Sequence, residues 1–330
     1  MTRYKLSVVA CIYRVEPYIE QACRSLFSQT LDGIEFIFID DASPDRSVEK
    51  LWNIIHNEYP QLANDIKLVR NETNQGVSVC RQIATDMASG DYIIHFDTDD
   101  WIEPETYCEM YMKAVATDAD VVICDVIEEW GNGSTKETEH VADIEKGIFK
   151  YDIISEKIHS YLWNKLVKRS LITDNGIRFM NNIGFMEDYV FMSEISLEVN
   201  KVEFVPKLFY HYRKTNDNSL TKGFSSKQLT AMLKIVPYLE GKLKNFFSDE
   251  KLRSALYCMA LRFKLSILLN TRGEEQKKYS KLFPEADKYI FKNQIFGFYY
   301  KPALWLNSIG WLGGFNIIVS AVEFIKRIRK

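Results

Sequence analysis

A short apolar segment runs directly into three acids that fall within four consecutive positions. Residues 92–96, Tyr-Ile-Ile-His-Phe, are typical of a buried strand, and Asp97, Asp99 and Asp100 follow at its end. Ligands of an open α/β sheet bind where the strands end. Carboxylates this close together repel one another unless a cation lies between them, and hard divalent cations prefer oxygen ligands. The stretch therefore predicts a Mg²⁺ or Mn²⁺ site shared with nucleotide phosphates, with an acidic loop after an edge strand as the alternative.

The overall composition limits the class of protein. The 330 residues are enough for one large α/β domain with an appendage, or for two domains. The formal net charge of -3 argues against a general nucleic-acid-binding protein, because such a protein carries a surplus of basic residues. The six cysteines have no paired spacing, and the N-terminus has no long apolar segment typical of a secretory signal. We therefore expect reduced thiols and a cytoplasmic location.

The N-terminal part of the chain alternates between strand-like and helix-like segments. Apolar strands are predicted over residues 6–12, 34–39, 66–70 and 92–96. Helical segments are predicted over about 15–27, from an N-cap at Ser43 and Pro44 onward, and over 77–88. This alternation predicts a mostly parallel sheet with helices on both faces.

The middle of the chain mixes both kinds of structure. The pattern predicts a helix over about 104–117, a strand over 121–124, a hairpin turn at 131–134, helical structure over 153–172, a helix over about 184–199, and two short strands, 202–205 and 208–213, divided by Pro206. Glu187 and Asp188 fall in the first turn of one of these helices, where the helix dipole favours acids. They form a second acidic landmark.

Helical periodicity dominates the C-terminal part, so we expect a catalytic domain over residues 1–220 and a helical region over residues 221–330. The tail from Ile295 to Lys330 is rich in aromatic residues and ends in a basic cluster, but polar residues and glycines make it a poor membrane span. It fits a helix lying on an anionic membrane surface, on the cytoplasmic face of the inner membrane. The alternative is a helical cap that packs on the catalytic domain or on another subunit.

Six motifs occur in an order that resembles a known family. They are Leu6 to Arg14 (LSVVACIYR), Phe38 to Asp45 (FIDDASPD), Asn74-Gln-Gly76 with Arg81, Gly90 to Asp100 (GDYIIHFDTDD), Trp163 to Leu166 (WNKL), and Glu187-Asp188. Together they resemble the inverting GT-A glycosyltransferases of family 2, bacterial enzymes that build capsule, lipopolysaccharide and wall polymers. The first turn departs from the usual pattern, because Cys11 and Arg14 stand where the family usually has Pro and Asn.

The resemblance implies a GT-A, Rossmann-like α/β fold and a UDP-sugar donor. In such a site Asp41 accepts a hydrogen bond from the N–H of the nucleobase. Tyr13 and the backbone of Ala10 lie beside the base. Asn74 and Arg81 help to hold the nucleotide.

The resemblance also assigns the acids that follow the fourth strand. Asp97 contacts the ribose. Asp99 is the first choice for the metal ligand within the DXD motif, and Asp100 competes for that role. Arg213, on the last strand before a loop that includes Ser219, offers a cation to the β-phosphate.

By the same resemblance, Asp188 is the general base that takes the proton of the acceptor hydroxyl, and Glu187 orients the acceptor or the base. The alternative for both is that they only stabilise the start of a helix.

Other candidates have structural alternatives that we weigh equally or prefer. Trp163 could stack on a sugar or pack in the core, and Lys165 could reach a phosphate. Asp40 could orient the neighbouring loop, but we prefer a helix-capping role. For His95 and His211 we prefer packing and structural roles.

The expected function is therefore metal-dependent, inverting transfer of a hexose or N-acetylhexosamine from a UDP-sugar to a glycan or a lipid-linked acceptor. One alternative is a sugar-1-phosphate nucleotidyltransferase, but the first turn lacks the glycine-rich phosphate loop of such enzymes. Another alternative is a non-catalytic sugar-nucleotide or glycan-binding protein. A dinucleotide dehydrogenase is disfavoured because no Gly-x-Gly-x-x-Gly follows the first strand.

Overall fold

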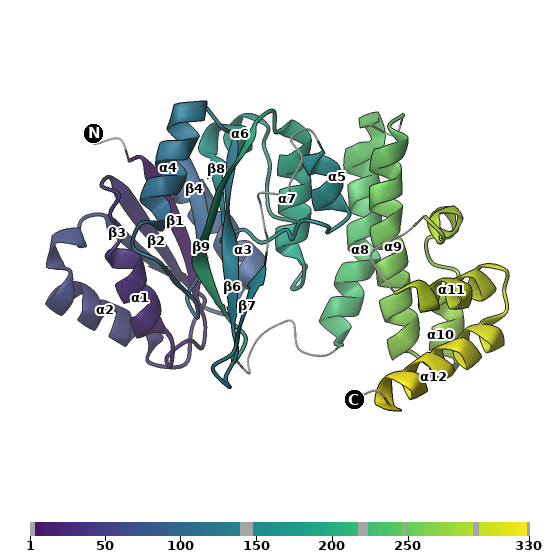
Figure 1. The fold of residues 1–330 in the computed structure, drawn as a ribbon. Coiled ribbons are helices and arrows are strands. Elements are labelled where there is room, and N and C mark those ends of the chain that lie inside the picture. Colours follow the sequence, from purple (N-terminus) through teal and green to yellow (C-terminus); the bar gives the residue numbers. More distant parts are fainter. Residues whose placement is uncertain (1–3, 139–147, 217–223, 247, 293–296, 329–330) are drawn as a thin grey trace. The chain divides into compact units, whose positions relative to one another are not determined.

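The computed structural model describes residues 4–138, 148–216, 224–246, 248–292 and 297–328. Its internal contacts divide the chain into two compact units (Figure 1). Unit 1 comprises Met1–Phe149 and His159–Lys222, and unit 2 comprises Lys150–Ile158 and Gly223–Lys330. Residues 150–158 thus group with the C-terminal unit, although they precede the boundary that we expect near residue 220.

Unit 1 is built around one mixed β-sheet. Its described strands are β1 (Leu6–Ile12), β2 (Ile34–Asp40), β3 (Ile66–Arg70), β4 (Tyr92–Asp97), β5 (Trp101–Ile102), β6 (Val121–Glu129), β7 (Thr135–Thr138), β8 (Lys165–Lys168) and β9 (Val202–Arg213). They pair in the order β3-β2-β1-β4-β8-β6-β9-β5, with β7 beside β6. The pairs among β1, β2, β3 and β4 are parallel, whereas β8 runs antiparallel to both of its neighbours.

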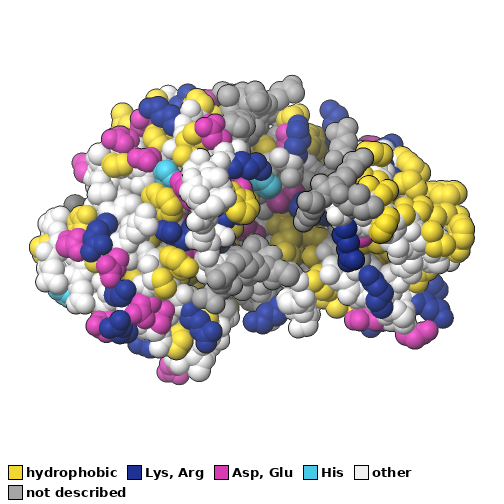
Figure 2. Space-filling model, turned by 60° about the horizontal axis from the view of Figure 1, so that its bottom comes forward, with side chains coloured by type: hydrophobic (Ala, Val, Ile, Leu, Met, Phe, Trp, Pro, Cys, Tyr) yellow, Lys and Arg dark blue, Asp and Glu magenta, His cyan; other side chains and the backbone are white. Residues whose placement is uncertain are grey.

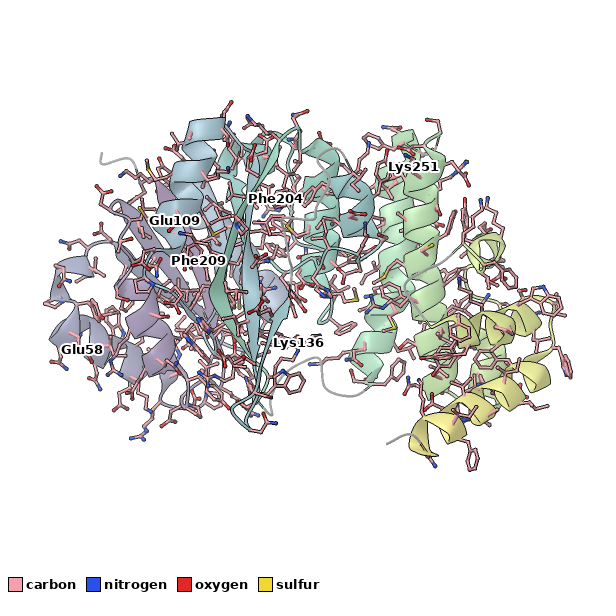
Figure 3. The ribbon with its side chains drawn as sticks, viewed as in Figure 1. Glu58, Glu109, Lys136, Phe204, Phe209 and Lys251 are labelled. Atoms are coloured by element: carbon pink, nitrogen blue, oxygen red, sulfur yellow. The ribbon has the colours of Figure 1, made fainter. Side chains whose placement is uncertain are left out.

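Helices cover both faces of this sheet (Figure 1). Those of unit 1 are α1 (Ile19–Phe27), α2 (Ser47–Glu58), α3 (Val77–Met87), α4 (Thr106–Thr117), α6 (Arg169–Asp174) and α7 (Glu187–Glu198), with a short 3-10 helix, η1 (Pro60–Leu62). Helix α3 packs on β1 and β2, and α4 packs on β6 and β9. Between α4 and β9, Lys207 Nζ donates a hydrogen bond to Glu109 Oε1 (2.6 Å), beside the buried Phe209 (Figure 3).

Unit 2 is helical in its described residues. Its helices are α5 (Phe149–Ile154), α8 (Ser226–Lys242), α9 (Glu250–Asn270), α10 (Gly273–Tyr279), α11 (Lys301–Ser308) and α12 (Leu312–Ile328), with three short 3-10 helices, η3 (Leu243–Phe246), η4 (Pro284–Tyr289) and η5 (Phe298–Tyr300). The described helices include none with the length and apolar character that crossing a bilayer requires.

Strands β1 and β2 form the centre of the core. Every residue of β2 is buried, and all of β1 is buried except the half-buried Cys11. Both strands therefore have continuous apolar runs with little alternation, which is typical of parallel strands covered on both faces. The predicted α/β fold, with its C-terminal helical region, is confirmed. The hairpin turn at residues 131–134 is also confirmed, because β6 and β7 pair antiparallel around it.

Helix α2 begins later than the sequence predicts. We expect Ser43 and Pro44 at its start, but its first residue is Ser47. The Ser43 hydroxyl instead accepts a hydrogen bond from Arg14 N–H (2.9 Å) and donates to Asp45 Oδ1 (2.7 Å). Because this hydroxyl joins the turns after β1 and β2, it does not cap a helix.

Two further segments differ from the prediction. Residues 165–168, predicted as helical, form β8 between β4 and β6, because a short apolar segment has no periodicity that separates strand from helix. The two predicted strands around Pro206 are one strand, β9. Its pairing with β6 shifts register beside Asp125, and this irregularity accommodates a proline that has no N–H to donate.

Candidate active site

The acids that follow β2 and β4 lie at one edge of the sheet. Strand β1 pairs in parallel with both neighbours, so that Ile12 is opposite Asp40 and Cys11 is opposite Asp97. Asp41 N–H continues this arrangement by donating to the Ile12 carbonyl (3.0 Å). Thr98 Oγ1, within the acidic stretch, donates to the Cys11 carbonyl (2.7 Å). The topology therefore brings together the ends of three strands, where α/β sheets bind ligands.

Asp41 organises the loop that precedes α3. Its Oδ1 accepts hydrogen bonds from Asn71 Nδ2 (2.8 Å) and Gln75 N–H (2.8 Å), and its Oδ2 accepts one from Gly76 N–H (2.8 Å). Gly76 has a φ of +86°, which residues with a Cβ rarely adopt. Asn74 Nδ2 lies 3.4 Å from the Asp41 carbonyl oxygen. The predicted residues Asp41 and Asn74 thus lie together.

Asp40, the neighbour of Asp41, has a structural role. Its Oδ1 accepts from Ser43 N–H (2.8 Å), and its Oδ2 forms an ion pair with Arg70 Nε (3.2 Å). Burial raises the pKa of this carboxyl group. These contacts stabilise the turn after β2 and do not cap a helix.

One buried guanidinium joins the end of β4 to the start of α7. Arg81 Nη2 donates to Asp97 Oδ1 (2.9 Å), and Arg81 Nη1 donates to Glu187 Oε1 (2.6 Å). Burial alone would lower the pKa of Arg81, but the charges of Asp97 and Glu187 raise it, and Asp188 adds to their effect. The charge of Asp188 therefore also acts on this guanidinium. The two acidic landmarks that the sequence predicts meet at a single group.

Asp188 is more accessible than its neighbour. The Glu187 side chain is buried against Arg81, whereas Asp188 is half-buried, and its Oδ1 accepts a hydrogen bond from Tyr189 N–H (2.7 Å). Met186, just before the helix, has a left-handed φ of +60°, so the chain turns sharply into these acids. Both acids lie at the positive end of α7, and Asp188 is the more accessible of the two.

The end of β9 holds the remaining acids. Asp99 Oδ2 accepts from Asn216 Nδ2 (2.8 Å), and Asp100 accepts from Tyr210 OH (2.9 Å) and Arg213 N–H (2.7 Å) on its two oxygens. Burial, and then the charge of neighbouring acids, raises the pKa of Asp99 and Asp100. Because both oxygens of Asp100 are held by the fold, Asp99 is the better placed to bind a ligand.

The acids fit a divalent cation that a substrate helps to hold. Among the described residues, no three or more acidic, histidine or cysteine side chains converge as a protein-only metal cage. A Mg²⁺ site shared with phosphates needs only one or two carboxylates from the protein. A cation beside Asp99 would also offset the repulsion that contributes to the raised pKa of this group.

Arg213 lies against the same acids. Its Nε donates to the Asp99 carbonyl oxygen (2.7 Å), and its Nη2 donates to Gln21 Oε1 (2.7 Å). The guanidinium also lies 4.6 Å from the centre of the Trp101 ring. Arg213 is thus brought to the acidic stretch, as the sequence predicts, while Ser219 lies outside the described residues.

The first turn presents one exposed aromatic ring. Tyr13 is 41% exposed, and the Arg14 guanidinium lies 5.3 Å from the centre of its ring. Ala10 is buried in β1, opposite Phe38 and Phe96. Tyr13 therefore has a surface on which a nucleobase could stack.

Trp163 and Lys165 have contacts that favour structural roles. The Trp163 ring is buried and stacks on Tyr210 (4.0 Å between ring centres) and on Tyr161 (4.5 Å). Lys165 is buried as well, and its Nζ donates to the His159 carbonyl oxygen (2.7 Å). Neither contact points to a sugar or a phosphate.

The two histidines also have structural surroundings, as expected. His211 stacks on Trp101, and its ring nitrogens lie 2.8 Å from Glu129 Oε1 and 2.9 Å from Glu103 Oε1. His95 is buried, and its ring contacts Phe179 and Phe191.

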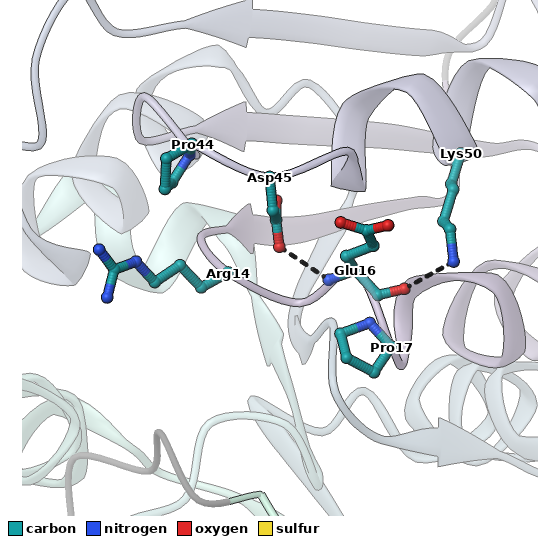
Figure 4. Close-up of a pocket in the computed structure, with 6 residues that line it drawn as sticks. All are labelled: Arg14, Glu16, Pro17, Pro44, Asp45 and Lys50. Carbon is teal, nitrogen blue, oxygen red and sulfur yellow. Dashed lines mark hydrogen bonds between the residues drawn. The ribbon is translucent and has the colours of Figure 1, made fainter.

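A shallow depression of about 500 Å³ lies at the turns after β1 and β2. It is lined by Arg14, Glu16, Pro17, Pro44, Asp45 and Lys50 (Figure 4). Glu16 joins the two turns, because its N–H donates to Asp45 Oδ2 (3.0 Å) and its carbonyl oxygen accepts from Lys50 Nζ (3.1 Å). The depression contains none of the candidate catalytic or metal-binding acids, so it does not form the candidate site.

Three residues that position the side chains of the candidate site are not marked by the sequence. Asn216 contacts Asp99, Tyr210 contacts Asp100, and Gln21 contacts Arg213. Their partners are more than 100 positions away along the chain, so no local pattern marks these contacts. Only Tyr210 could be found from a local pattern, because the alternation of residues along β9 predicts that its side chain faces the core.

Comparison with known proteins shows the family of this chain. A family model described as glycosyl transferase family 2 matches residues 7–181. The protein EpsH of Bacillus subtilis (strain 168) is 31% identical over 214 residues, which cover 63% of this chain and 60% of EpsH. The cholesterol galactosyltransferase of Borreliella burgdorferi is 30% identical over 222 residues, which cover 63% of this chain and 60% of that protein. The matches thus span about three fifths of these relatives' lengths.

Solved structures have the same fold. The structure of S. aureus TarS residues 1–349 in complex with UDP-GlcNAc has a TM-score of 0.75 and 19% sequence identity, and the match covers 97% of this chain and 91% of that chain. The family match covers more than half of the sequence. This chain belongs to glycosyl transferase family 2.

Proposed function

We propose that the protein is an inverting, metal-dependent glycosyltransferase of surface polysaccharide synthesis in bacteria. It moves a hexose or N-acetylhexosamine from a UDP-sugar to a hydroxyl group of a glycan or lipid-linked acceptor, with residues 1–220 carrying the catalysis. The observation that carries the proposal is the Arg81 guanidinium, which contacts both Asp97 and Glu187. Asp97, which would bind the sugar donor, and Glu187, which would orient the acceptor, thus both contact one side chain.

The nucleotide occupies the edge formed by β1, β2 and the loop before α3. Asp41 accepts a hydrogen bond from the uracil N–H, Tyr13 stacks on the base, and the backbone at Ala10 lies beside it. Asn74 supports the loop through the Asp41 carbonyl. Asp97 accepts from a ribose hydroxyl while Arg81 fixes its orientation.

The diphosphate lies over the acidic stretch. Asp99 would hold Mn²⁺ or Mg²⁺, and Asp100 is the competing candidate for that role. Such a cation, when bound, offsets the negative charge that appears on the departing UDP. Arg213 adds a positive charge at the same place, because its guanidinium is already fixed to the Asp99 carbonyl oxygen.

The acceptor hydroxyl meets Asp188. A carboxylate oxygen of Asp188 takes the hydroxyl proton while the acceptor oxygen attacks the anomeric carbon. The bond from this carbon to the diphosphate oxygen breaks, and its electron pair leaves with UDP. Attack from the face opposite the leaving group inverts the configuration. Glu187, held by Arg81, orients the acceptor.

The first test is release of UDP from a panel of sugar nucleotides in the presence of Mn²⁺, read by mass spectrometry with candidate acceptors. Transfer of sugar with release of UDP supports the proposal. Pyrophosphate-dependent formation of UTP would instead identify a nucleotidyltransferase, and binding without turnover would identify a sugar-nucleotide or glycan-binding protein.

A lipid-linked acceptor would place the reaction at a membrane. We therefore expect the enzyme on the cytoplasmic face of the inner membrane, in peripheral contact with it. The name of the relative from Borreliella burgdorferi, a cholesterol galactosyltransferase, supports a lipid acceptor as one class to include in the panel.

A further inference from the structure

The C-terminal helices carry an apolar surface that the proposed reaction does not use. Many of the large hydrophobic side chains exposed to solvent lie in unit 2, with exposed fractions between 37% and 80%: Phe291, Phe298, Tyr299, Trp305, Ile309, Trp311, Ile317, Phe324 and Ile325. Figure 2 shows hydrophobic side chains gathered over the C-terminal part of the molecule, at the right of the view. Exposed apolar side chains that gather in this way mark an interaction surface.

Helix α12 has two apolar stripes. Phe315 and Val319, one turn apart, are buried in unit 2. Ile317, Phe324 and Ile325 point the other way and are 66%, 64% and 51% exposed. Positions separated by seven and eight residues lie on one face of a helix. Packing within unit 2 therefore accounts for the first stripe only, and the second faces solvent in the described part of the chain.

The preceding helix and turn extend this surface. Trp305 and Ile309 are one turn apart at α11 and are 45% and 59% exposed. Trp311, in the turn that leads into α12, is 57% exposed. Its ring lies so close to Gly314 that a Cβ at this position would be 2.7 Å from it, which fixes the indole beside the helix start. Tryptophan is enriched where lipid headgroups meet acyl chains.

The charges around this surface match an anionic partner. Residues 291–330 contain six basic residues and a single acid, Glu323. Glu323 is already engaged, because it accepts hydrogen bonds from Tyr300 OH (2.5 Å) and Lys326 Nζ (3.2 Å). Lys292 and Arg327 are exposed. Exposed basic side chains in the same segment as an apolar, tryptophan-containing surface suit a bilayer with anionic lipids.

We propose that this surface, formed by Trp305, Ile309, Trp311, Ile317, Phe324 and Ile325, binds an anionic phospholipid bilayer. We name it the membrane face. Helices α11 and α12 lie in the plane of the headgroups, the apolar side chains enter the acyl boundary, and the basic side chains contact lipid phosphates. The inference rests on the peripheral membrane contact of the proposed function and assigns that contact to a surface of unit 2. It does not depend on the reaction proposed for unit 1.

Vesicle co-sedimentation of the full chain tests the proposal. The vesicles are pure phosphatidylcholine or a mixture of phosphatidylcholine with phosphatidylglycerol, and neither contains an acceptor. The test variant replaces Ile317, Phe324 and Ile325 with serine, and a second variant is Lys292→Glu with Arg327→Glu. The matched control replaces Met112 and Val115 with serine, because both are exposed on α4 (60% and 55%).

We expect the wild type and the control to bind the anionic vesicles, and both test variants to bind them at least about tenfold more weakly. Binding should weaken in high salt and on pure phosphatidylcholine. Equal binding by the serine variant, or no binding by the wild type, would overturn the proposal. A wild-type dimer in solution that the serine variant abolishes, without vesicle binding, would show that a second copy of the chain covers this face. UDP affinity measured on the same samples reports separately on the proposed function.

Discussion

Arg81 Nη1 lies 2.6 Å from Glu187 Oε1, a contact between two buried residues that are 106 positions apart. The same guanidinium contacts Asp97 at 2.9 Å. Helix α3 therefore fixes the first turn of α7 to the end of β4. The positions of Asp97 and of Glu187, the neighbour of the proposed base Asp188, therefore depend on one guanidinium group.

Replacing Glu187 with alanine should lower the free energy of unfolding by about 3 kcal/mol, because it leaves a buried charge with one partner fewer. Urea denaturation measures this. The matched control is Glu58→Ala, which removes a bidentate surface pair with Arg24 (2.8 Å for both bonds) (Figure 3). This change should cost less than about 1 kcal/mol. Equal losses in the two variants would show that the Arg81 contact has no special weight.

Replacing Asp188 with asparagine should leave UDP-sugar affinity unchanged and lower kcat at least about a hundredfold, because the amide cannot take a proton from the acceptor. Calorimetry and steady-state kinetics separate the two effects. Glu198→Gln, at the exposed end of the same helix, should behave as the wild type. A near-normal kcat in the asparagine variant would mean that another group is the base.

Replacing Asp99 with alanine should abolish the gain in UDP affinity that Mn²⁺ provides, because the metal loses its direct protein ligand. Titrations of UDP with and without Mn²⁺ measure the difference. The control is Asp174→Asn, an exposed acid outside the candidate site. If Mn²⁺ still strengthened UDP binding in the alanine variant, the metal assignment would be wrong.

Replacing His95 with phenylalanine should reduce the pH dependence of stability. Burial, and then the charge of Arg81, lowers the pKa of His95 well below its usual value. Among the described atoms, neither ring nitrogen has a hydrogen-bond partner. The unfolded chain therefore takes up a proton below about pH 6.5 that the folded chain does not, and stability falls as the pH falls.

For one such group the loss between pH 7 and pH 5 is about 2 kcal/mol. Urea denaturation at both pH values should show this extra loss in the wild type and not in His95→Phe. His56, an exposed histidine of α2, provides the control substitution His56→Gln, which should retain the wild-type dependence. An unchanged dependence in His95→Phe would show that His95 is protonated in the folded protein.

The parts of the fold that follow from local pattern are predicted well. Strands β1 to β4 and helix α3 lie within a residue or two of their predicted bounds, because long apolar runs and helical spacing determine them locally. The strand β8 is not predicted, because its four residues become a strand only by pairing between β4 and β6. The predicted start of α2 is wrong, because the Ser43 hydroxyl forms hydrogen bonds with Arg14 N–H and Asp45 Oδ1 and does not cap the helix.

The candidate site shows the same division. The acids are visible in the sequence because they follow strands or open a helix. The contacts that give these acids different roles are not visible in the sequence, because their partners come from distant segments: Arg81 from α3 and Arg213 from β9. This is why the sequence leaves Asp99 and Asp100 as competitors, whereas the hydrogen bonds to both oxygens of Asp100 favour Asp99.

The most direct test of the central claim is a crystal structure with UDP and Mn²⁺, with anomalous diffraction to locate the metal. We expect one Mn²⁺ peak about 2.1 Å from an Asp99 carboxylate oxygen, in contact with the diphosphate, and the uracil beside Asp41 and Tyr13. UDP bound away from this edge of the sheet, or a metal without contact to Asp99, would contradict the account.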